Sequence, residues 1–499
     1  MAFGRLLFIF FFLISADVHA YYLFNEKVRN AYKEIISLRL DHGALLLEDV
    51  KRQQPGNTIV FLYENYIDFL KAFISEDEGQ FKAFKKNSAL RLKQLERHGT
   101  ESASPFHLYA ISEILLQEAM LKLKFKEYIT GANDIRKSYK LIERNKAVYP
   151  TFLLNKKLSG FIHTLVGAVP KDYRWLVDMV GMKGTIPLGT EELKSLYVLL
   201  GNSEFEVYRE EVLFYLSNIH NSFAKNEAHA HELLGWMESY ASDNTLIRYC
   251  YANVVMKMGR NDDAFRILSS KSNSAGVFPF YYLDYKLGLS RLRKLDLTAD
   301  GDIKKFIKAF PGMNYRKAAY QKLAWIDFLK GDSVGYRKNM NTILSVGVSN
   351  VDEDKEAHTE ASTGEYPNPI LLRSRLLFDG GYYMQSWNEI TSAKVKAFPL
   401  FRDQLELTYR LGRIMHKLKF TEKAIHYYSQ TLRNGEKARY YFAANSSLLI
   451  GNIHEDEGAF DLARKYYEKC LSIRGHDYQN SIDQKAQAGI DRLNAMTSK

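Results

Sequence analysis

The sequence contains few of the residues that a disulfide-stabilised or strand-rich protein uses. Among its 499 residues there are only 2 cysteines and 10 prolines. So few cysteines exclude a disulfide framework. Because Cys250 and Cys470 each lie in an apolar stretch of helical pattern, we predict two buried thiols. The scarcity of proline, together with few alternations of apolar and polar residues, favours helix throughout.

The motifs of common catalytic and nucleotide-binding sites are also absent. The sequence has no P-loop, no GxGxxG segment after a strand, no GxSxG elbow and no CxxC pair. The most enzyme-like string is His229 to Glu232, but two histidines two residues apart on a helix point about 200° away from each other. Gly235 and Trp236 stand where an HExxH motif would place its second histidine. We therefore predict no catalytic, cofactor-binding or metal-binding residues.

Residues 1–20 have the pattern of a secretory signal peptide. Arg5 precedes an apolar run, and small residues end the segment at Ala20. The apolar run is much shorter than the ~20 residues of a spanning helix, so we favour cleavage after Ala20. A membrane anchor that is kept is the alternative. We predict an exported protein, periplasmic or outer-membrane-associated if it is bacterial.

Basic residues outnumber acidic ones, 69 to 58, for a formal net charge of +11. This balance permits contact with an anionic surface without requiring it. The densest basic run is residues 82–93, where lysines alternate with Phe84, Leu90 and Leu92. We interpret it as an amphipathic helix with a solvated face, and contact with an anionic membrane is the alternative. Nucleic acid is not an expected partner of an exported chain.

Small and aromatic residues recur at one spacing near the C-terminal end. The two sets, offset by 39 positions, are Gly412, Ala424 and Tyr428, and Gly451, Ala463 and Tyr467. In each set we predict that the glycine marks a close approach of two helices, that the alanine is the matching small contact, and that the tyrosine fills the space beyond. The pattern resembles the tetratricopeptide repeat (TPR), in which a Leu-Gly pair, an alanine and an aromatic follow in this order.

The resemblance implies an all-α fold, a right-handed superhelical TPR-like α-solenoid of antiparallel helix pairs. One repeat cannot bury its apolar face alone, so the rest of the chain should form further stacked pairs. Ala252 and Ala264 reproduce the twelve-residue spacing. We place an N-terminal helical region at 21–130, a Gly-rich helical hairpin with atypical repeats at 131–244, and TPR-like repeats at 245–499.

Glycines interrupt the apolar segment 157–193, which also contains a proline break at Pro170. They are Gly160, Gly167, Gly181, Gly184 and Gly189. This order is similar to the TPR family 39 proteins and the related fungal inclusion-body clearance proteins, and we interpret the chain as an exported bacterial relative. We favour a helix pair in backbone contact. A small apolar ligand or lipid surface, and a membrane-spanning hairpin, are the alternatives.

Two further segments complete the C-terminal region. Carboxylates cluster in residues 348–369. A calcium site is the alternative for such a cluster, but the segment lacks the glycine and the closing glutamate of an EF-hand. We therefore predict a solvated acidic loop. Ile482, Ala486, Ile490 and Leu493 form one apolar stripe and predict a capping helix.

We therefore predict a non-catalytic scaffold for protein–protein interaction, with a protein or peptide as its partner. A peripheral membrane protein is the first alternative. A hydrolase or metal-dependent enzyme is the second, and it would need histidines or carboxylates that converge from separate repeats.

Overall fold

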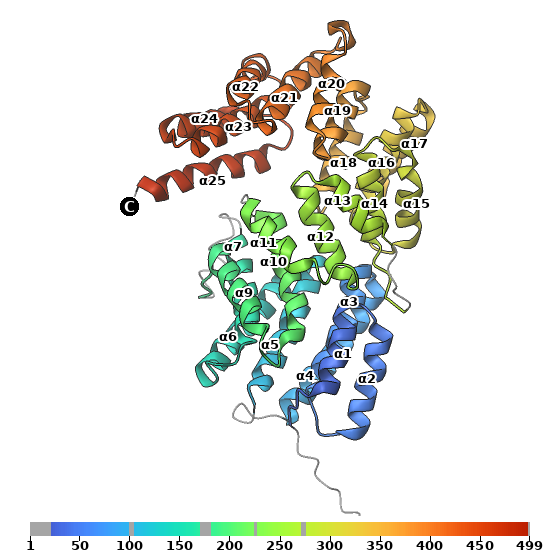
Figure 1. Cartoon of the computed structure of the whole chain (residues 1–499), viewed down its shortest axis with the longest axis vertical. Helices are drawn as coiled ribbons and strands as arrows, with labels where there is room; N and C mark the ends of the chain where they lie inside the picture. Colours follow the sequence, from blue (N-terminus) through green and yellow to red (C-terminus); the bar gives the residue numbers. More distant parts are fainter. Residues whose placement is uncertain (1–20, 99–103, 170–180, 224–226, 271–275, 498–499) are drawn as a thin grey trace, which may run out of the picture. The chain divides into compact units, whose positions relative to one another are not determined.

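The computed structural model describes residues 21–98, 104–169, 181–223, 227–270 and 276–497. Within these ranges the regular structure is helical, apart from one isolated parallel bridge between Tyr21 and Asn57 (Figure 1). The predicted all-α solenoid is confirmed. The expected signal peptide at 1–20 and the proline break at Pro170 lie outside the described residues.

The chain divides into two compact units. Unit 1 comprises residues 1–251 and 271–280, and unit 2 comprises residues 252–270 and 281–499. The helices of unit 1 are α1 (Glu26–Ile36), α2 (Leu40–Gln53), α3 (Val60–Ser75), α4 (Glu78–His98), α5 (Pro105–Lys124), α6 (Tyr128–Val148), α7 (Asn155–Ala168), α9 (Ile186–Leu200), η2 (Glu206–Tyr208), α10 (Arg209–Phe223) and α11 (Glu227–Met237).

Helix α12 (Thr245–Lys257) crosses the boundary between the units. The helices of unit 2 are α13 (Asn261–Ser269), α14 (Tyr282–Leu292), η3 (Leu297–Ala299), α15 (Asp300–Ala309), α16 (Arg316–Leu329), α17 (Ser333–Ser345), α18 (Asp352–Thr363), α19 (Pro369–Asp379), α20 (Tyr383–Thr391), η4 (Val395–Ala397), α21 (Phe401–Lys417), α22 (Thr421–Gly435), α23 (Phe442–Asp456), α24 (Phe460–Ser472) and α25 (Gln479–Thr497).

One three-residue turn joins the helices of several pairs. It connects α1–α2, α5–α6, α12–α13, α16–α17, α19–α20, α21–α22 and α23–α24. Its middle residue always has a left-handed backbone, with φ between 65° and 84°. Glycine, which adopts this conformation without a steric penalty, fills the position in four pairs, while Leu38, Lys126 and Lys419 fill it in the others.

Small residues flank this turn at fixed positions. One lies seven residues before the left-handed residue and the other five residues after it, which is the twelve-residue spacing of the sequence pattern. The pairs are Ala31 and Gly43, Ala119 and Gly131, Ala252 and Ala264, Ser374 and Ser386, Gly412 and Ala424, and Gly451 and Ala463; in α16–α17 they are Ala324 and the larger Tyr336. The same helix pair therefore occurs in unit 1, at α1–α2 and α5–α6, as well as in unit 2.

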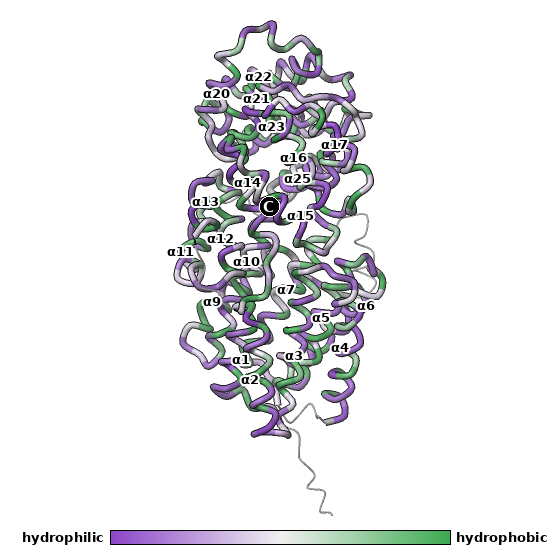
Figure 2. The backbone as a smooth tube through the Cα atoms, turned by 90° about the vertical axis from the view of Figure 1, so that its right-hand side faces the viewer, coloured by the Kyte–Doolittle hydropathy of each residue, from purple (hydrophilic) through white to green (hydrophobic). Residues whose placement is uncertain are grey.

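Apolar residues of the helices make the core, and hydrophobic and hydrophilic stretches alternate along the chain (Figure 2). Most helices bury one face, whereas α5 is buried on all sides from Phe106 to Ala119. At the C-terminal end α25 packs against α24 and α23. Its residues Ile482, Ala486 and Leu493 are buried there. This is the apolar stripe that predicted a capping helix.

The acidic segment 348–369 differs from the prediction. It contains helix α18 and is not a loop throughout. Asp354 of α18 is fully buried, and its carboxylate accepts hydrogen bonds from the backbone N–H groups of Tyr315 (2.6 Å) and Ala318 (2.9 Å). These groups lie at the N-terminus of α16, where N–H groups have no partner within their own helix. Asp354 therefore caps α16 and joins α18 to it.

Candidate functional site

The residues predicted to hold the repeats together lie between paired helices. A Cβ atom on Gly412 would lie 2.6 Å from Cδ1 of Tyr428, and one on Gly451 would lie 2.7 Å from Cδ1 of Tyr467. Each glycine therefore faces the aromatic ring of its own pair. The alanines of the pattern, Ala252, Ala264, Ala424 and Ala463, have no exposed surface.

The Gly-rich segment forms the pair α7–α9 in unit 1. Gly189 lies against the carbonyl oxygen of Gly160, and a Cβ atom on Gly184 would lie 2.6 Å from the Cα of His163. Backbone approaches of this kind leave no room for side chains, as in the helix pair in backbone contact that we favoured. No helix in the described part of the chain has the length and apolarity needed to cross a membrane.

Convergent carboxylates, which an enzyme would need, occur in unit 1. Nζ of Lys157 on α7 lies 2.8 Å from Oε2 of Glu113 on α5 and 2.7 Å from Oε2 of Glu211 on α10. We call these three residues the Lys157 cluster. Tyr32 (2.6 Å) and Tyr215 (2.7 Å) donate their hydroxyls to Glu211 as well.

The Lys157 cluster is enclosed. The side chains of Lys157, Glu113 and Glu211 are 0%, 1% and 5% exposed. Burial raises the pKa of Glu113, against the opposing effect of Lys157. Because these groups have partners and almost no contact with solvent, we interpret the cluster as a structural ion network rather than a site that meets a substrate.

The other chemical candidates are a pair of histidines and two cysteines. His229 lies on α11 with its ring centroid 5.4 Å from that of His220. No group of three or more metal-ligating side chains occurs in the described ranges. Cys250 and Cys470 are buried and unbridged, and burial raises the pKa of each thiol to about 12. Two buried thiols are what the sequence predicted.

The basic run 82–93 lies on α4, which buries Phe84 and exposes Lys82, Lys86 and Lys93. The helix is amphipathic with a solvated basic face, as expected.

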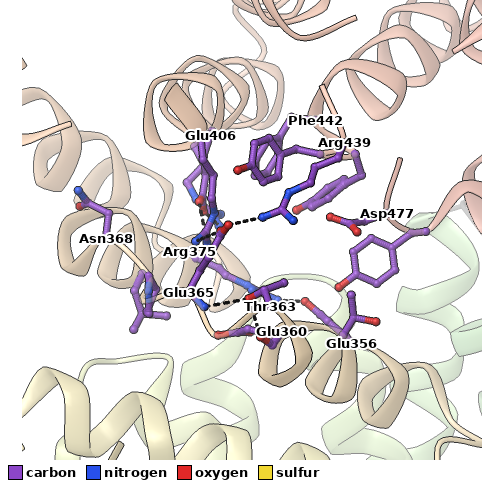
Figure 3. A pocket seen from close by; sticks show the side chains of 18 residues that line it. Glu356, Glu360, Thr363, Glu365, Asn368, Arg375, Glu406, Arg439, Phe442 and Asp477 are labelled. Atoms are coloured by element: carbon purple, nitrogen blue, oxygen red, sulfur yellow. Dashed lines mark hydrogen bonds and ion pairs between the residues drawn. The ribbon is translucent and has the colours of Figure 1, made fainter. Parts of the chain in front are cut away.

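A pocket in unit 2 brings together many charged side chains. It encloses about 120 Å³ and is lined by α18, α19, α21, the N-terminus of α23 and the turn before α25. Arg375, Arg402, Arg410 and Arg439 line it, and so do Glu356, Glu360, Glu365 and Glu406. We call it the Arg–Glu pocket. Figure 3 shows Glu356 and Glu360 approaching from α18, with Glu406, Arg439 and Phe442 across the pocket.

Cations recur at equivalent positions on the first helices of the pairs in unit 2. Each cation lies either two residues before the small residue of its first helix or one residue after it. These two positions are three residues apart and therefore lie on the same face of the helix. They are Lys286 on α14, Lys322 on α16, Arg375 on α19, and Arg410 and Arg413 on α21. We call this set the inner row. Helix α14 counts as a first helix because it packs on α15, with Gly288 as its small residue against Ile303. Successive first helices touch one another, so the row is continuous.

Aromatic rings and carboxylates surround the inner row. Nζ of Lys322 lies 3.9 Å, and Cζ of Arg375 lies 4.8 Å, from the ring centroid of Trp325. Arg413 lies over the ring of Phe378 at 4.2 Å. Such cation–π contacts hold the cations in place without neutralising them.

Partnership with carboxylates divides the inner row into two groups. Arg375 pairs with Glu356, and Arg410 Nε donates to Glu406 at 2.8 Å. Lys286, Lys322 and Arg413 make no ion pair with a carboxylate in the parts of the chain that the structure describes. Burial lowers the pKa of Lys286 and of Lys322 to about 8, because a charged amine is costly where water is excluded.

The sequence contained a signal for the inner row that we missed. Lys286, Lys322 and Arg410 each stand two residues before the small residue of their helix, which is Gly288, Ala324 or Gly412. A cation that recurs beside the small residue of successive helices predicts a row of cations along one face of the repeats. The net charge of the chain does not predict such a row.

Comparison with known families agrees with this geometry. Residues 444–477 match the family model described as the tetratricopeptide repeat. The chain contains a tetratricopeptide repeat. The matched residues comprise most of α23 and all of α24, and the other pairs with the same turn and spacing follow the geometry of this TPR. No curated protein matches the chain.

Proposed function

We propose that the chain is a non-catalytic protein-interaction scaffold, and that the inner row of unit 2 binds an acidic segment of a protein partner. The observation that carries the proposal is the set of three cations, Lys286, Lys322 and Arg413, that have no ion-paired carboxylate among the described residues. They come from three different helix pairs, so one elongated partner segment would contact all of them.

The surroundings of these cations favour binding. Lys286 and Arg413 are half-buried and Lys322 is buried, so most of the cost of removing water from them has already been met in folding. A carboxylate that reaches them gains charge-assisted hydrogen bonds in a region of low dielectric constant. Their alignment along successive helices gives the partner an extended path, as in the concave surfaces of repeat proteins.

Affinity capture with paired variants tests this proposal. The variant Lys286→Glu/Arg413→Glu reverses two charges of the inner row, and Lys465→Glu reverses an exposed charge on α24, the second helix of its pair. The wild type and the Lys465 variant should retain the same partner, and the inner-row variant should lose it. The complex should also weaken as salt rises, because charged contacts are screened. Equal retention by all three proteins would contradict the proposal.

Contact with an anionic membrane is a second candidate function, favoured by the exposed Lys82, Lys86 and Lys93 on α4. Flotation with vesicles that contain anionic lipid tests it. Association that salt abolishes, and that Lys82→Glu/Lys86→Glu removes, would support the membrane function. Absence of flotation in low salt would exclude it.

We further propose that the chain is exported, on the pattern of residues 1–20, and that it is a bacterial relative of the TPR family 39 group that its Gly-rich segment resembles. N-terminal sequencing of the protein from cell envelopes should find Tyr21 as the first residue. A chain that starts at Met1 in the cytoplasm would contradict export.

A further inference from the structure

Helix α18 does not belong to a helix pair. It follows the pair α16–α17 and precedes the pair α19–α20, and it packs on both α16 and α17. The first helices α14, α16, α19 and α21 carry the inner row, so α18 lies against the side of unit 2 that the cations line. It occupies part of the surface that the proposed partner would use.

The contacts of α18 and the residues just after it are of two kinds: Ala357, Ala361 and Tyr366 pack in an apolar cluster with α16 and α17, and the glutamates make polar contacts. Only Asp354 and Ala357 of the helix are buried. Glu356 pairs with Arg375, and Glu360 accepts hydrogen bonds from Gln321 (2.6 Å) and Trp325 (2.8 Å). The hydrophobic effect therefore holds α18 on α16 and α17, whereas its contacts with the arginines depend on charge alone.

The residues after α18 continue this pattern. Glu365 pairs with Arg402 at 3.2 Å and with Arg439. Its partners belong to α21 and to the turn before α23, so residues 352–366, which we call the acidic strap, extend along three helix pairs.

The charges show what the acidic strap does to its surroundings. The strap brings Glu356, Glu360 and Glu365 into the Arg–Glu pocket. Four arginines line that pocket, and outside the strap the carboxylates that line it are Glu406 and Asp477. Without the strap the arginines would therefore outnumber the carboxylates of the pocket. The three glutamates therefore act on the pocket as an acidic ligand would.

We propose that the acidic strap is a built-in competitor, which an acidic helical segment of the partner displaces from the pocket. This inference rests on the proposed function, because it assumes that the same face binds an acidic partner. The strap keeps one end attached through Asp354 at the N-terminus of α16, while the ion pairs of Glu356 and Glu365 release. Displacement exchanges one set of carboxylates for another, so the arginines stay paired throughout.

A peptide in trans tests the competition. The probe is a fluorescein-labelled synthetic peptide with the sequence of residues 352–366, followed by fluorescence anisotropy in low salt. Three full-length proteins are compared: the wild type, the strap variant Glu356→Gln/Glu360→Gln/Glu365→Gln, and the control variant Glu422→Gln/Asp461→Asn/Glu468→Gln, whose carboxylates are exposed on the second helices α22 and α24.

We expect the peptide to bind the strap variant about tenfold more tightly than the wild type and the control variant, a difference of about 1.4 kcal/mol. Equal affinity for all three proteins would overturn the competition while leaving an acidic-segment site in place. Binding to none of them would overturn the proposed function as well. A peptide with glutamines in place of its glutamates should not bind, and if it binds like the original, charge is not what the pocket recognises.

Hydrogen exchange of the wild type keeps the proposal testable if the strap variant does not fold. The amides of α18 should exchange at least tenfold faster than those of α16 and α19, and 0.5 M NaCl should accelerate them further, because salt weakens the ion pairs that hold the strap. Exchange as slow as in α16, and unchanged by salt, would overturn the competition.

Discussion

Replacement of Lys157 by methionine removes the only cation of the enclosed cluster in unit 1 and leaves two carboxylates without it. Breaking a buried ion pair by removing one partner costs about 3 to 5 kcal/mol. Tyr32 and Tyr215 still donate hydrogen bonds to Glu211 in the variant, so part of the charge stays compensated. We therefore expect a loss near the lower end, about 3 kcal/mol.

Urea unfolding followed by circular dichroism measures this loss. With an m-value of about 1 to 3 kcal/mol/M, the urea concentration at the midpoint of the unfolding of unit 1 should fall by roughly 1 M or more. The matched control is Lys156→Met on the same helix, where the side chain is exposed, and it should shift the midpoint by little. Equal shifts for the two variants would refute the view that Lys157 neutralises buried carboxylates.

The loss should also depend on pH. Burial already raises the folded-state pKa of Glu113, and removal of Lys157 raises it further. A carboxyl group with a raised folded pKa contributes stability below its unfolded pKa and loses that contribution as pH rises through its folded pKa. The destabilisation of Lys157→Met should therefore be larger at pH 8 than at pH 5, and Glu113→Gln added to the variant should recover part of it.

Three further variants test unit 2. Gly412→Ala should lower stability by about 1 to 3 kcal/mol, because the new Cβ atom would lie 2.6 Å from the ring of Tyr428. Gly301→Ala on α15, with no heavy atom within 4 Å of its Cβ, should instead raise stability by about 0.5 to 1 kcal/mol; thermal melts that rank the two variants the other way would contradict this. Burial raises the pKa of Asp354 to about 6, so its contribution to stability is present below its unfolded pKa and is lost as pH rises through about 6. Asp354→Asn removes this titration. The melting temperature of the variant minus that of the wild type should therefore rise between pH 4 and pH 7. A difference that stays constant would contradict the raised pKa of Asp354.

The helix pairs were predictable from the sequence because their contacts are local. Gly412 and Tyr428 belong to one pair, and the turn between their helices has three residues, so a fixed spacing records the contact. Stacked helices were expected in the N-terminal region too, but the pairs α1–α2 and α5–α6 were not identified as copies of the same repeat. Their small residues, such as Ala31 and Gly43, have the same spacing but lack the aromatic that drew attention to the others.

Helix α18 was not predictable in the same way. Its sequence has few apolar residues, so no hydrophobic periodicity marks it as a helix. It is held by partners from other helices, such as Arg375 and Trp325. The Lys157 cluster has a similar origin, since Glu113 and Glu211 lie 44 residues before and 54 residues after the lysine. Contacts between separate helix pairs leave no fixed spacing in the sequence.

The central claim is that the inner row of unit 2 is the face that binds a partner. Acetylation of lysines in the isolated protein and in its captured complex, followed by mass spectrometry, tests it most directly. Because burial lowers the pKa of Lys286 to about 8, a large fraction of its amine is neutral and reactive at pH 8. The claim predicts that the partner slows the acetylation of Lys286 severalfold and leaves the exposed Lys465 unchanged. Protection of Lys465 with no change at Lys286 would contradict it.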